Sequence, residues 1–255
     1  MPTFLSEQQH LDGLTFAAGA LARYAHAAGL HAPVPTCPDW TVRDLLAHQG
    51  TVHRWAAATL RGQESDTAVF EAEGLAASDP VGWLEAGAQE LSSTLRRVPA
   101  DVTAPVFLKD PPASRAFWAR RQCHETTIHA ADALSAELGH APSAINFPIS
   151  AELAADGIDE LLTGFLPRSR SGVHSERPTT LVIAPDDRDE RWHMAISAAP
   201  VVTTRHPGGP AVEGDWTIRG SAAELYLRLW HRLDISEDAA AWPAGWHENF
   251  RINWS

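Results

Sequence analysis

Apolar residues recur every three or four positions through the first half of the chain, which is the pattern of amphipathic helices. The clearest stretch shows this spacing at Leu11, Leu14, Ala18, Leu21 and Ala25. The pattern predicts four long helices, at residues 7–29, 41–61, 80–98 and 114–138. Ser6 is a candidate N-cap of the first, Asp79 precedes Pro80 at the start of the third, and Gly139 ends the fourth. Residues 61–79 have weak periodicity, so little regular structure is expected there.

The second half of the chain has a different pattern. The proline-containing segment 140–150 is interpreted as a linker, and a further helix is expected near residues 151–166. Short runs typical of β-strands follow, at residues 179–184, 192–197, 201–204 and 215–218. A last helix is predicted at residues 221–233, with Ser221 and Glu224 as a candidate capping box.

These elements predict an α+β protein with two domains. Residues 1–140 are expected to form a four-helix bundle, and residues 141–255 a smaller α+β domain. The cores of four-helix bundles commonly hold metal sites built from the side chains of facing helices. Candidate chemistry is therefore expected in the bundle.

Composition and charge narrow the range of partners. The chain has 255 residues and a formal net charge of −12, which argues against nucleic acid, because phosphates require a basic surface. No apolar run approaches the roughly 20 residues of a membrane span, and the first residues lack the basic region of a secretion signal. A soluble, cytoplasmic protein is expected. Two cysteines, Cys37 and Cys123, are too few for a disulfide framework.

Glu125 and His129 are a candidate pair of metal ligands. They are four residues apart, so on the helix predicted at 114–138 they lie about 40° from each other on one face. The spacing is not the His-Glu-x-x-His pattern of zinc proteases, because His124 and His129 lie roughly 140° apart around the helix. A Glu-x-x-x-His pair is also common as a solvated pair on a surface helix, so a metal site needs a further ligand from another helix.

Two histidines of the helix predicted at 41–61 could supply that ligand. The apolar stripe of this helix runs through Val42, Leu45, Val52 and Ala56. His48 lies on one flank of the stripe and His53 on the other, so periodicity does not choose between them. Either one can also be an ordinary histidine at the edge of a helix.

Three segments of the chain resemble the mycothiol-dependent maleylpyruvate isomerase family. Residues 34–55 (VPTCPDWTVRDLLAHQGTVHRW) resemble the N-terminal signature of the family, and residues 119–133 (ARRQCHETTIHAADA) resemble its second signature. Residues 214–232 (GDWTIRGSAAELYLRLWHR) are similar to its small α/β domain. The resemblance covers most of the chain, and it implies a DinB-like metal-binding bundle followed by that small domain.

The resemblance also implies a set of ligands. In the family, the metal is held by the histidine that closes a Trp-Thr-x-x-(x)-Leu-x-x-His element and by the Glu and His of Glu-x-x-x-His. The matching residues in this chain are His48, Glu125 and His129, which leaves His53 as a neighbour of the site. Gln49 departs from the family pattern, which more often has an apolar residue beside the first ligand.

Further polar residues share the face of Glu125 and His129. The face is formed by Trp118, Arg121, Gln122, Glu125, His129 and Asp132, about 100° from the apolar side of the helix. Such a stripe is ordinarily the solvated side of a helix; with the resemblance, it is expected to form the wall of a cleft. Asp132 could then orient a ligand histidine, or form an ion pair with Arg121 or Arg120. Trp118 and Trp40 are candidates for lining the pocket.

The function implied by the resemblance is thiol chemistry at a divalent metal, with zinc as the first expectation. A metal with open coordination positions can hold a small-molecule thiol as its nucleophilic thiolate. The resemblance makes that thiol mycothiol, the thiol of actinobacteria, and the second partner a small electrophile. Addition of the thiolate followed by its elimination gives cis–trans isomerisation, whereas retention of the adduct, or loss of a leaving group, gives S-transfer.

Two alternatives belong to other functional classes. A metal-bound water could act hydrolytically, which requires a general base; with Glu125 used as a ligand, Asp132 is the nearest substitute. A binding module without turnover could keep the bundle, although it would not need all three ligands. No catalytic residue beyond the ligands is assigned, and neither Cys37 nor Cys123 is expected to be a nucleophile.

Overall fold

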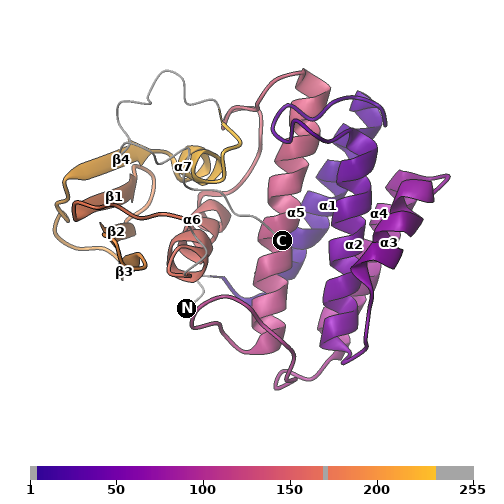
Figure 1. The fold of residues 1–255 in the computed structure, drawn as a ribbon, viewed down its shortest axis with the longest axis horizontal. Coiled ribbons are helices and arrows are strands. Elements are labelled where there is room, and N and C mark those ends of the chain that lie inside the picture. The colour runs from indigo at the N-terminus through magenta and orange to yellow at the C-terminus, as the bar shows by residue number, and fades with distance from the viewer. Residues whose placement is uncertain (1–4, 169–171, 234–255) are drawn as a thin grey trace. The chain divides into compact units, whose positions relative to one another are not determined.

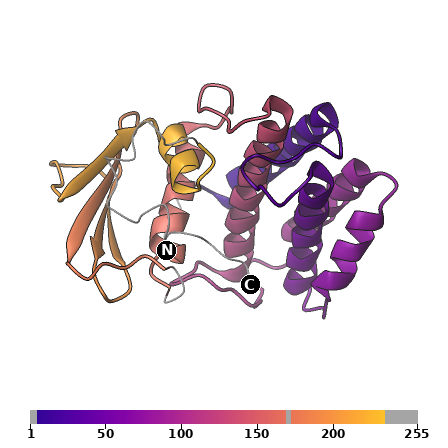
Figure 2. The same ribbon diagram turned by 45° about the horizontal axis from the view of Figure 1, so that its top comes forward.

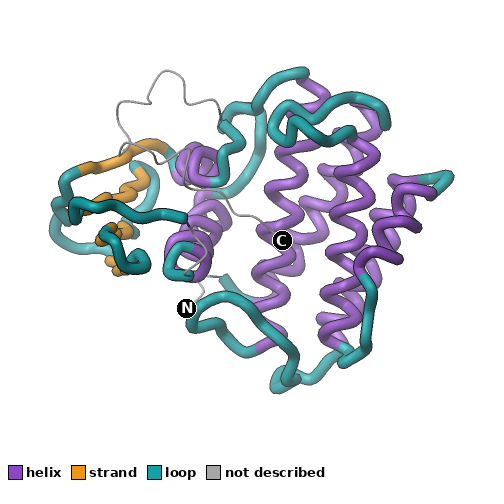
Figure 3. The backbone as a smooth tube through the Cα atoms, in the orientation of Figure 1, coloured by secondary structure: helices purple, strands orange, loops and turns teal. Residues whose placement is uncertain are grey.

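The computed structural model describes residues 5–168 and 172–233. These residues form two compact units. The helical unit consists of residues 5–106 and 112–142, and the sheet unit contains residues 107–111 together with the described residues from 143 onward. The α+β fold class predicted from the sequence is confirmed: Figure 3 shows the strands in the sheet unit alone. The domain limits expected from the sequence, 1–140 and 141–255, stay a prediction.

The helical unit contains the four predicted long helices and one short helix. Their bounds are α1 Glu7–Ala28, α2 Val42–Leu60, α3 Thr67–Ala76, α4 Pro80–Arg97 and α5 Ser114–Leu138. Capping boxes begin α1 at Ser6 and α2 at Thr41, and α4 begins with the expected Asp79 cap and Pro80. Gly139 follows α5 with a φ of 75°, a left-handed conformation that glycine adopts without strain.

The expectation of an irregular stretch between residues 61 and 79 was wrong, because α3 lies there. Asp66 caps this helix by accepting a hydrogen bond from the Ala68 N–H. Gly74 is its only buried residue, and it lies so close to the ring of Trp83 that an added Cβ would be 2.8 Å from it. Val69 and Leu75 are exposed. A helix that buries so little has no apolar stripe by which a sequence can reveal it.

Packing within the helical unit pairs the helices unequally. The most extensive contacts of α5 are with α1, whereas α2 packs mainly against α4 and α3. Figures 1 and 2 show these neighbours side by side. Contact between α2 and α5 is less extensive. The polar side chains of the candidate site lie along this sparser interface.

The sheet unit combines one sheet with two helical segments. The helical elements are α6 Ala151–Asp159, which continues as the π-helix η1 Glu160–Phe165, and α7 Ala222–Leu229. The strands are β1 Thr179–Pro185, β2 Arg191–Ile196, β3 Val202–His206 and β4 Trp216–Gly220, and their order in the sheet is β3-β2-β1-β4. Strand β1 is antiparallel to β2 and parallel to β4. All four predicted strands are therefore present.

Two local predictions in the sheet unit need correction. The helix expected at 151–166 changes from α-helical to π-helical geometry at Glu160. Only half of the expected capping box at α7 forms: Ser221 accepts from the Glu224 N–H, while the Glu224 carboxylate pairs with Arg228 at 2.7 Å. No helix among the described residues has the length and apolar character needed to cross a membrane.

Candidate functional site

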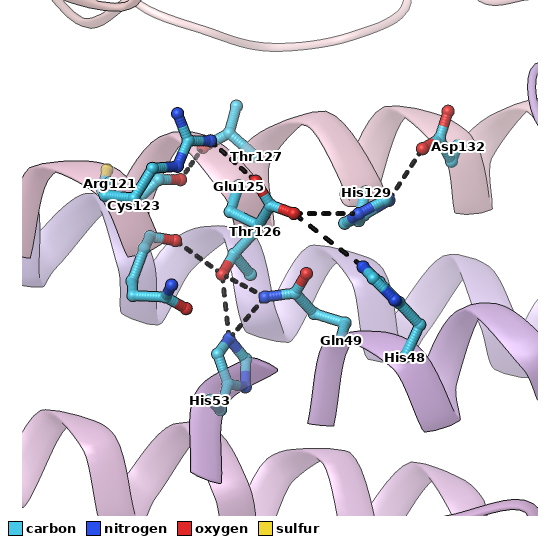
Figure 4. Close-up of polar contacts among 11 residues, drawn as sticks. His48, Gln49, His53, Arg121, Cys123, Glu125, Thr126, Thr127, His129 and Asp132 are labelled. Carbon is cyan, nitrogen blue, oxygen red and sulfur yellow. Dashed lines mark hydrogen bonds and ion pairs between the residues drawn. The ribbon is translucent and has the colours of Figure 1, made fainter. Parts of the chain in front are cut away.

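One side chain from α2 and two from α5 converge inside the helical unit (Figure 4). His48 Nε2 lies 3.8 Å from Glu125 Oε1, and His129 Nε2 lies 3.5 Å from the same oxygen. The ligand-type atoms of the three residues all lie within 4.8 Å of one another. The four-residue spacing on α5 places Glu125 and His129 on one face, as expected, and α2 brings His48 opposite them. The structure thus brings together the three residues singled out in the sequence.

Burial makes this cluster chemically unusual. Glu125 and His129 are each 5% exposed, and His48 is partly buried. The His48 Nε2 atom is itself buried and makes no hydrogen bond within the described part of the chain. A buried polar atom without a hydrogen bond costs free energy, so the position of this nitrogen does not contribute to stability.

Arg121 holds one side of the Glu125 carboxylate. Its Nη2 donates to Glu125 Oε2 at 2.8 Å, and both side chains are buried. Burial alone would raise the pKa of Glu125, but Arg121, with His129 and His48, holds it well below its ordinary value. The carboxylate is therefore ionised, with Oε2 fixed by the arginine and Oε1 turned toward the two histidines.

Asp132 orients His129 from the other side. Its Oδ2 lies 2.8 Å from His129 Nδ1, which leaves Nε2 to face Glu125. Burial lowers the pKa of His129, yet the carboxylates of Asp132 and Glu125 outweigh burial and raise it above its ordinary value. Of the two sequence alternatives for Asp132, the structure has the histidine contact.

Thr36 is a site residue that sequence reasoning missed. It lies in the proline-rich loop before α2, and its Oγ1 donates to Asp132 Oδ1 at 2.6 Å. Both oxygens of Asp132 are therefore engaged, one by Thr36 and the other by His129. Nothing in the local spacing links residue 36 to residue 132, because the contact depends on how the loop folds onto α5.

The two candidate pocket tryptophans lie in different surroundings. The half-buried Trp40 ring lies 4.8 Å from the His48 ring and 5.9 Å from that of His129, measured between centroids. Trp118 is 1% exposed, donates from its indole N–H to Pro105 O, and packs edge-on against Trp55. Trp40 covers the cluster, while Trp118 has the surroundings of a core residue.

His53 points toward a separate group of neutral side chains. Its Nε2 lies 2.9 Å from Gln49 Nε2 and 2.9 Å from Thr126 Oγ1. Burial, followed by the charge of Arg54, lowers the pKa of His53 to about 3, so the ring is neutral at physiological pH. Thr126 was not singled out in the sequence, where it is one more residue of a helix.

The fold and the site define a class: a helical-bundle protein with a histidine–carboxylate cluster in the bundle and a small α+β unit after it. Residues 12–134 match the family model of the mycothiol maleylpyruvate isomerase N-terminal domain, and residues 152–249 match that of the MDMPI C-terminal domain. The chain belongs to the mycothiol-dependent maleylpyruvate isomerase family. Both the resemblance drawn from the sequence and the expectation of an enzyme are confirmed at this level.

Comparison with solved structures supports the fold. A crystal structure of the mycothiol-dependent maleylpyruvate isomerase has a TM-score of 0.53 at 17% identity. A structure of a histidine-to-alanine mutant of such an enzyme has a TM-score of 0.56 at 16% identity. Each comparison covers 91% of both chains. Among curated proteins, no sequence matches this chain.

Proposed function

We propose that this chain is a mycothiol-dependent metalloenzyme that isomerises a small unsaturated acid. The observation that carries the proposal is the convergence of His48, Glu125 and His129 within 4.8 Å, in a chain of this family. Because such an enzyme needs a reduced thiol, the proposal includes the cytoplasm of a mycothiol-producing actinobacterium as its location.

The three residues fit a divalent metal. Ligand atoms about 2.1 Å from one tetrahedral zinc ion lie about 3.4 Å from each other. The separations of Glu125 Oε1 from His129 Nε2 and His48 Nε2, 3.5 Å and 3.8 Å, are close to that value. Two imidazoles and one carboxylate are also a donor set that zinc accepts while coordination positions stay open. The buried His48 Nε2, which makes no hydrogen bond to the described residues, supports the same assignment.

When bound, the metal would lower the pKa of a coordinated thiol and so favour the nucleophilic thiolate at neutral pH. The protein contributes the positions of the ligands. Asp132 fixes the tautomer and orientation of His129, and Arg121 holds Glu125 so that a single oxygen faces the histidines. Trp40 lies over the two histidine rings and limits access of water to them.

The isomerisation needs no net proton transfer. The sulfur of the thiolate forms a bond to one carbon of the conjugated double bond, whose electron pair moves toward the acid. Rotation about the resulting single bond and loss of the thiolate restore the double bond in the trans geometry. S-transfer uses the same first step but keeps the new bond, either by protonation of the adduct or by departure of a leaving group, so product analysis separates the two reactions.

Hydrolysis by a metal-bound water is less well supported by the geometry. It requires a general base near the water. Glu125 faces the histidines, and both oxygens of Asp132 are engaged by Thr36 and His129. The carboxylate that the sequence offered as a substitute base is therefore already used to position a histidine.

A cobalt-substituted protein tests the proposal. Adding mycothiol should produce an intense near-ultraviolet thiolate-to-cobalt band, and His129→Ala should remove both the band and turnover. Cys37→Ser and Cys123→Ser should keep both, because the small molecule supplies the nucleophile. Turnover at full rate without added thiol would contradict the proposal and favour hydrolysis. Loss of turnover in either cysteine variant would instead indicate a protein thiol.

A further inference from the structure

Beside the charged cluster, α2 and α5 are joined by three neutral side chains, Gln49, His53 and Thr126. Gln49 Nε2 donates to Thr126 Oγ1 at 3.0 Å and lies 2.9 Å from His53 Nε2. Thr126 Oγ1 lies 2.9 Å from His53 Nε2 and donates onward to Gln122 O, one turn earlier in α5. All three side chains are fully buried. We call this group the clamp.

On both helices, a residue of the clamp directly follows a candidate ligand. His48 and Gln49 are adjacent on α2, and Glu125 and Thr126 are adjacent on α5 (Figure 4). Each candidate ligand of the 48–125 pair is therefore followed by a residue that hydrogen-bonds across the same interface. A rise of about 1.5 Å per residue means that sliding either helix by one residue would break the 3.0 Å contact between Gln49 and Thr126.

The contact between α2 and α5 is less extensive than the main contacts of either helix. The main contacts of α5 are with α1, and those of α2 are with α4 and α3. The polar contacts consequently have more influence on how α2 is aligned with α5. If the helices moved apart, Gln49 and His53 would lose their contacts with the Thr126 hydroxyl, and each buried hydrogen bond lost costs about 0.5–1.5 kcal/mol.

The clamp is not an arrangement that stability alone explains. Gln49 Oε1 and His53 Nδ1 are buried and make no hydrogen bond within the described residues. Apolar side chains of similar size would avoid that cost. Polar contacts that are kept despite this cost fit a role in alignment, because buried hydrogen bonds favour one arrangement of the two helices.

We infer that Gln49, His53 and Thr126 are positioning residues that fix the register of α2 against α5 and so hold His48 opposite Glu125. This inference rests on the proposed metal site. The clamp acts through the ligands and touches neither metal nor substrate. Its removal should weaken metal binding, in the manner of residues that support metal ligands from outside the coordination shell.

The chain offers a closely matched control for the test. Thr126 and Thr127 are neighbours in α5, both are buried, and each donates to the carbonyl four residues earlier at 2.7 Å. Of these two hydroxyls, only that of Thr126 contacts α2 side chains within the described part of the chain. Thr126→Val and Thr127→Val therefore each remove an equivalent intrahelical hydrogen bond. Only Thr126→Val also removes a member of the clamp. Thr126→Ser keeps the hydroxyl and should restore the wild-type behaviour.

Cobalt affinity by competition with a chelator, and the cobalt visible spectrum, are the readouts. Thr126→Val should weaken cobalt binding about 10- to 100-fold and alter the spectrum. Thr127→Val and Thr126→Ser should stay close to wild type. Equal affinities and spectra for the two valine variants would overturn the inference while the metal site stands. A wild-type protein that binds neither cobalt nor zinc would overturn the metal site, and the inference with it.

Discussion

His48 and His53 lie five residues apart on α2 and both turn toward α5, where they meet opposite kinds of side chain (Figure 4). His48 faces the ionised Glu125, whose other oxygen is held by Arg121. His53 faces the hydroxyl of Thr126 and the amide of Gln49. One interface therefore contains a charged layer and a neutral layer, each with a histidine from the same helix.

The difference shows that a histidine takes its role from the charge of its neighbours. Both layers are buried, and burial penalises any charged form. In the neutral layer, burial and the charge of Arg54 outweigh the opposing effect of Glu125 and lower the pKa of His53 to about 3. In the charged layer, the carboxylates of Glu125 and Asp132 favour a positive charge at His129. A positive charge is therefore favoured in the charged layer and disfavoured in the neutral layer.

Replacement of either histidine by alanine should separate the two layers most strongly. His48→Ala, and more so His48→Ala with Glu125→Ala, should reduce zinc affinity by more than about 100-fold, because a ligand is lost rather than a supporting residue. His53→Ala should still bind about one zinc per chain when zinc is in excess, with affinity lowered no more than about 100-fold. Elemental analysis and chelator competition measure both quantities.

The reverse result would identify the wrong layer as the metal site. If His53→Ala strips the metal while the double variant retains it fully, the ligand assignment is refuted. Circular dichroism of each variant serves as the control for folding, since loss of the bundle would remove metal from either layer.

Removing the positive charge of the charged layer should have the next largest effect. Arg121→Met leaves the Glu125 carboxylate buried without its arginine, which should cost about 3–5 kcal/mol of unfolding free energy in metal-free protein. Adding Glu125→Gln to that variant should recover much of the loss, because the unpaired charge is gone. Urea denaturation measures both. A loss below about 1 kcal/mol for Arg121→Met would mean that the pair is solvated.

The sequence predicted most of the fold because most helices carry their own signals. Capping residues and a long apolar stripe mark α1, α2 and α4 in the sequence, and Gly139 marks the end of α5. The short helix α3 escaped prediction because it buries only Gly74. Periodicity detects the side that a helix buries, so a helix that buries almost nothing is invisible to it.

The candidate site was only partly predictable, for a different reason. Spacing along one helix pairs Glu125 with His129, but the choice between His48 and His53 depends on contacts between helices, and the family resemblance supplied it. The contact of Thr36 with Asp132 joins residues 96 positions apart. No local sequence pattern encodes such a contact, so it can be identified only from the folded structure.

Neutralising Asp132 should weaken zinc binding without removing a ligand. Asp132→Asn keeps the shape of the side chain but removes the charge that faces His129 Nδ1, so zinc affinity should fall about 10- to 100-fold. Thr36→Val removes one hydrogen bond to the same carboxylate and should have a smaller effect in the same direction. Chelator competition ranks the variants. An unchanged affinity in Asp132→Asn would show that the orientation of His129 does not depend on this carboxylate.

The smallest expected effect concerns the neutral layer and pH. The folded-state pKa of His53, about 3, lies below the ordinary value of 6.5, so in acid the unfolded chain takes up this proton before the folded one does. Stability should therefore fall as pH drops from 6.5 toward 3, with His53 contributing up to about 1.4 kcal/mol per pH unit.

His53→Gln isolates this contribution, because glutamine is polar but does not titrate. The unfolding free energies of metal-free wild type and variant are measured by urea denaturation at pH 7.5, 6 and 5. As pH falls, wild type should lose stability relative to the variant. The comparison uses metal-free protein so that loss of metal in acid does not add its own slope. Parallel stability profiles for the two proteins would mean that His53 titrates normally, and the neutral layer would then not exclude charge.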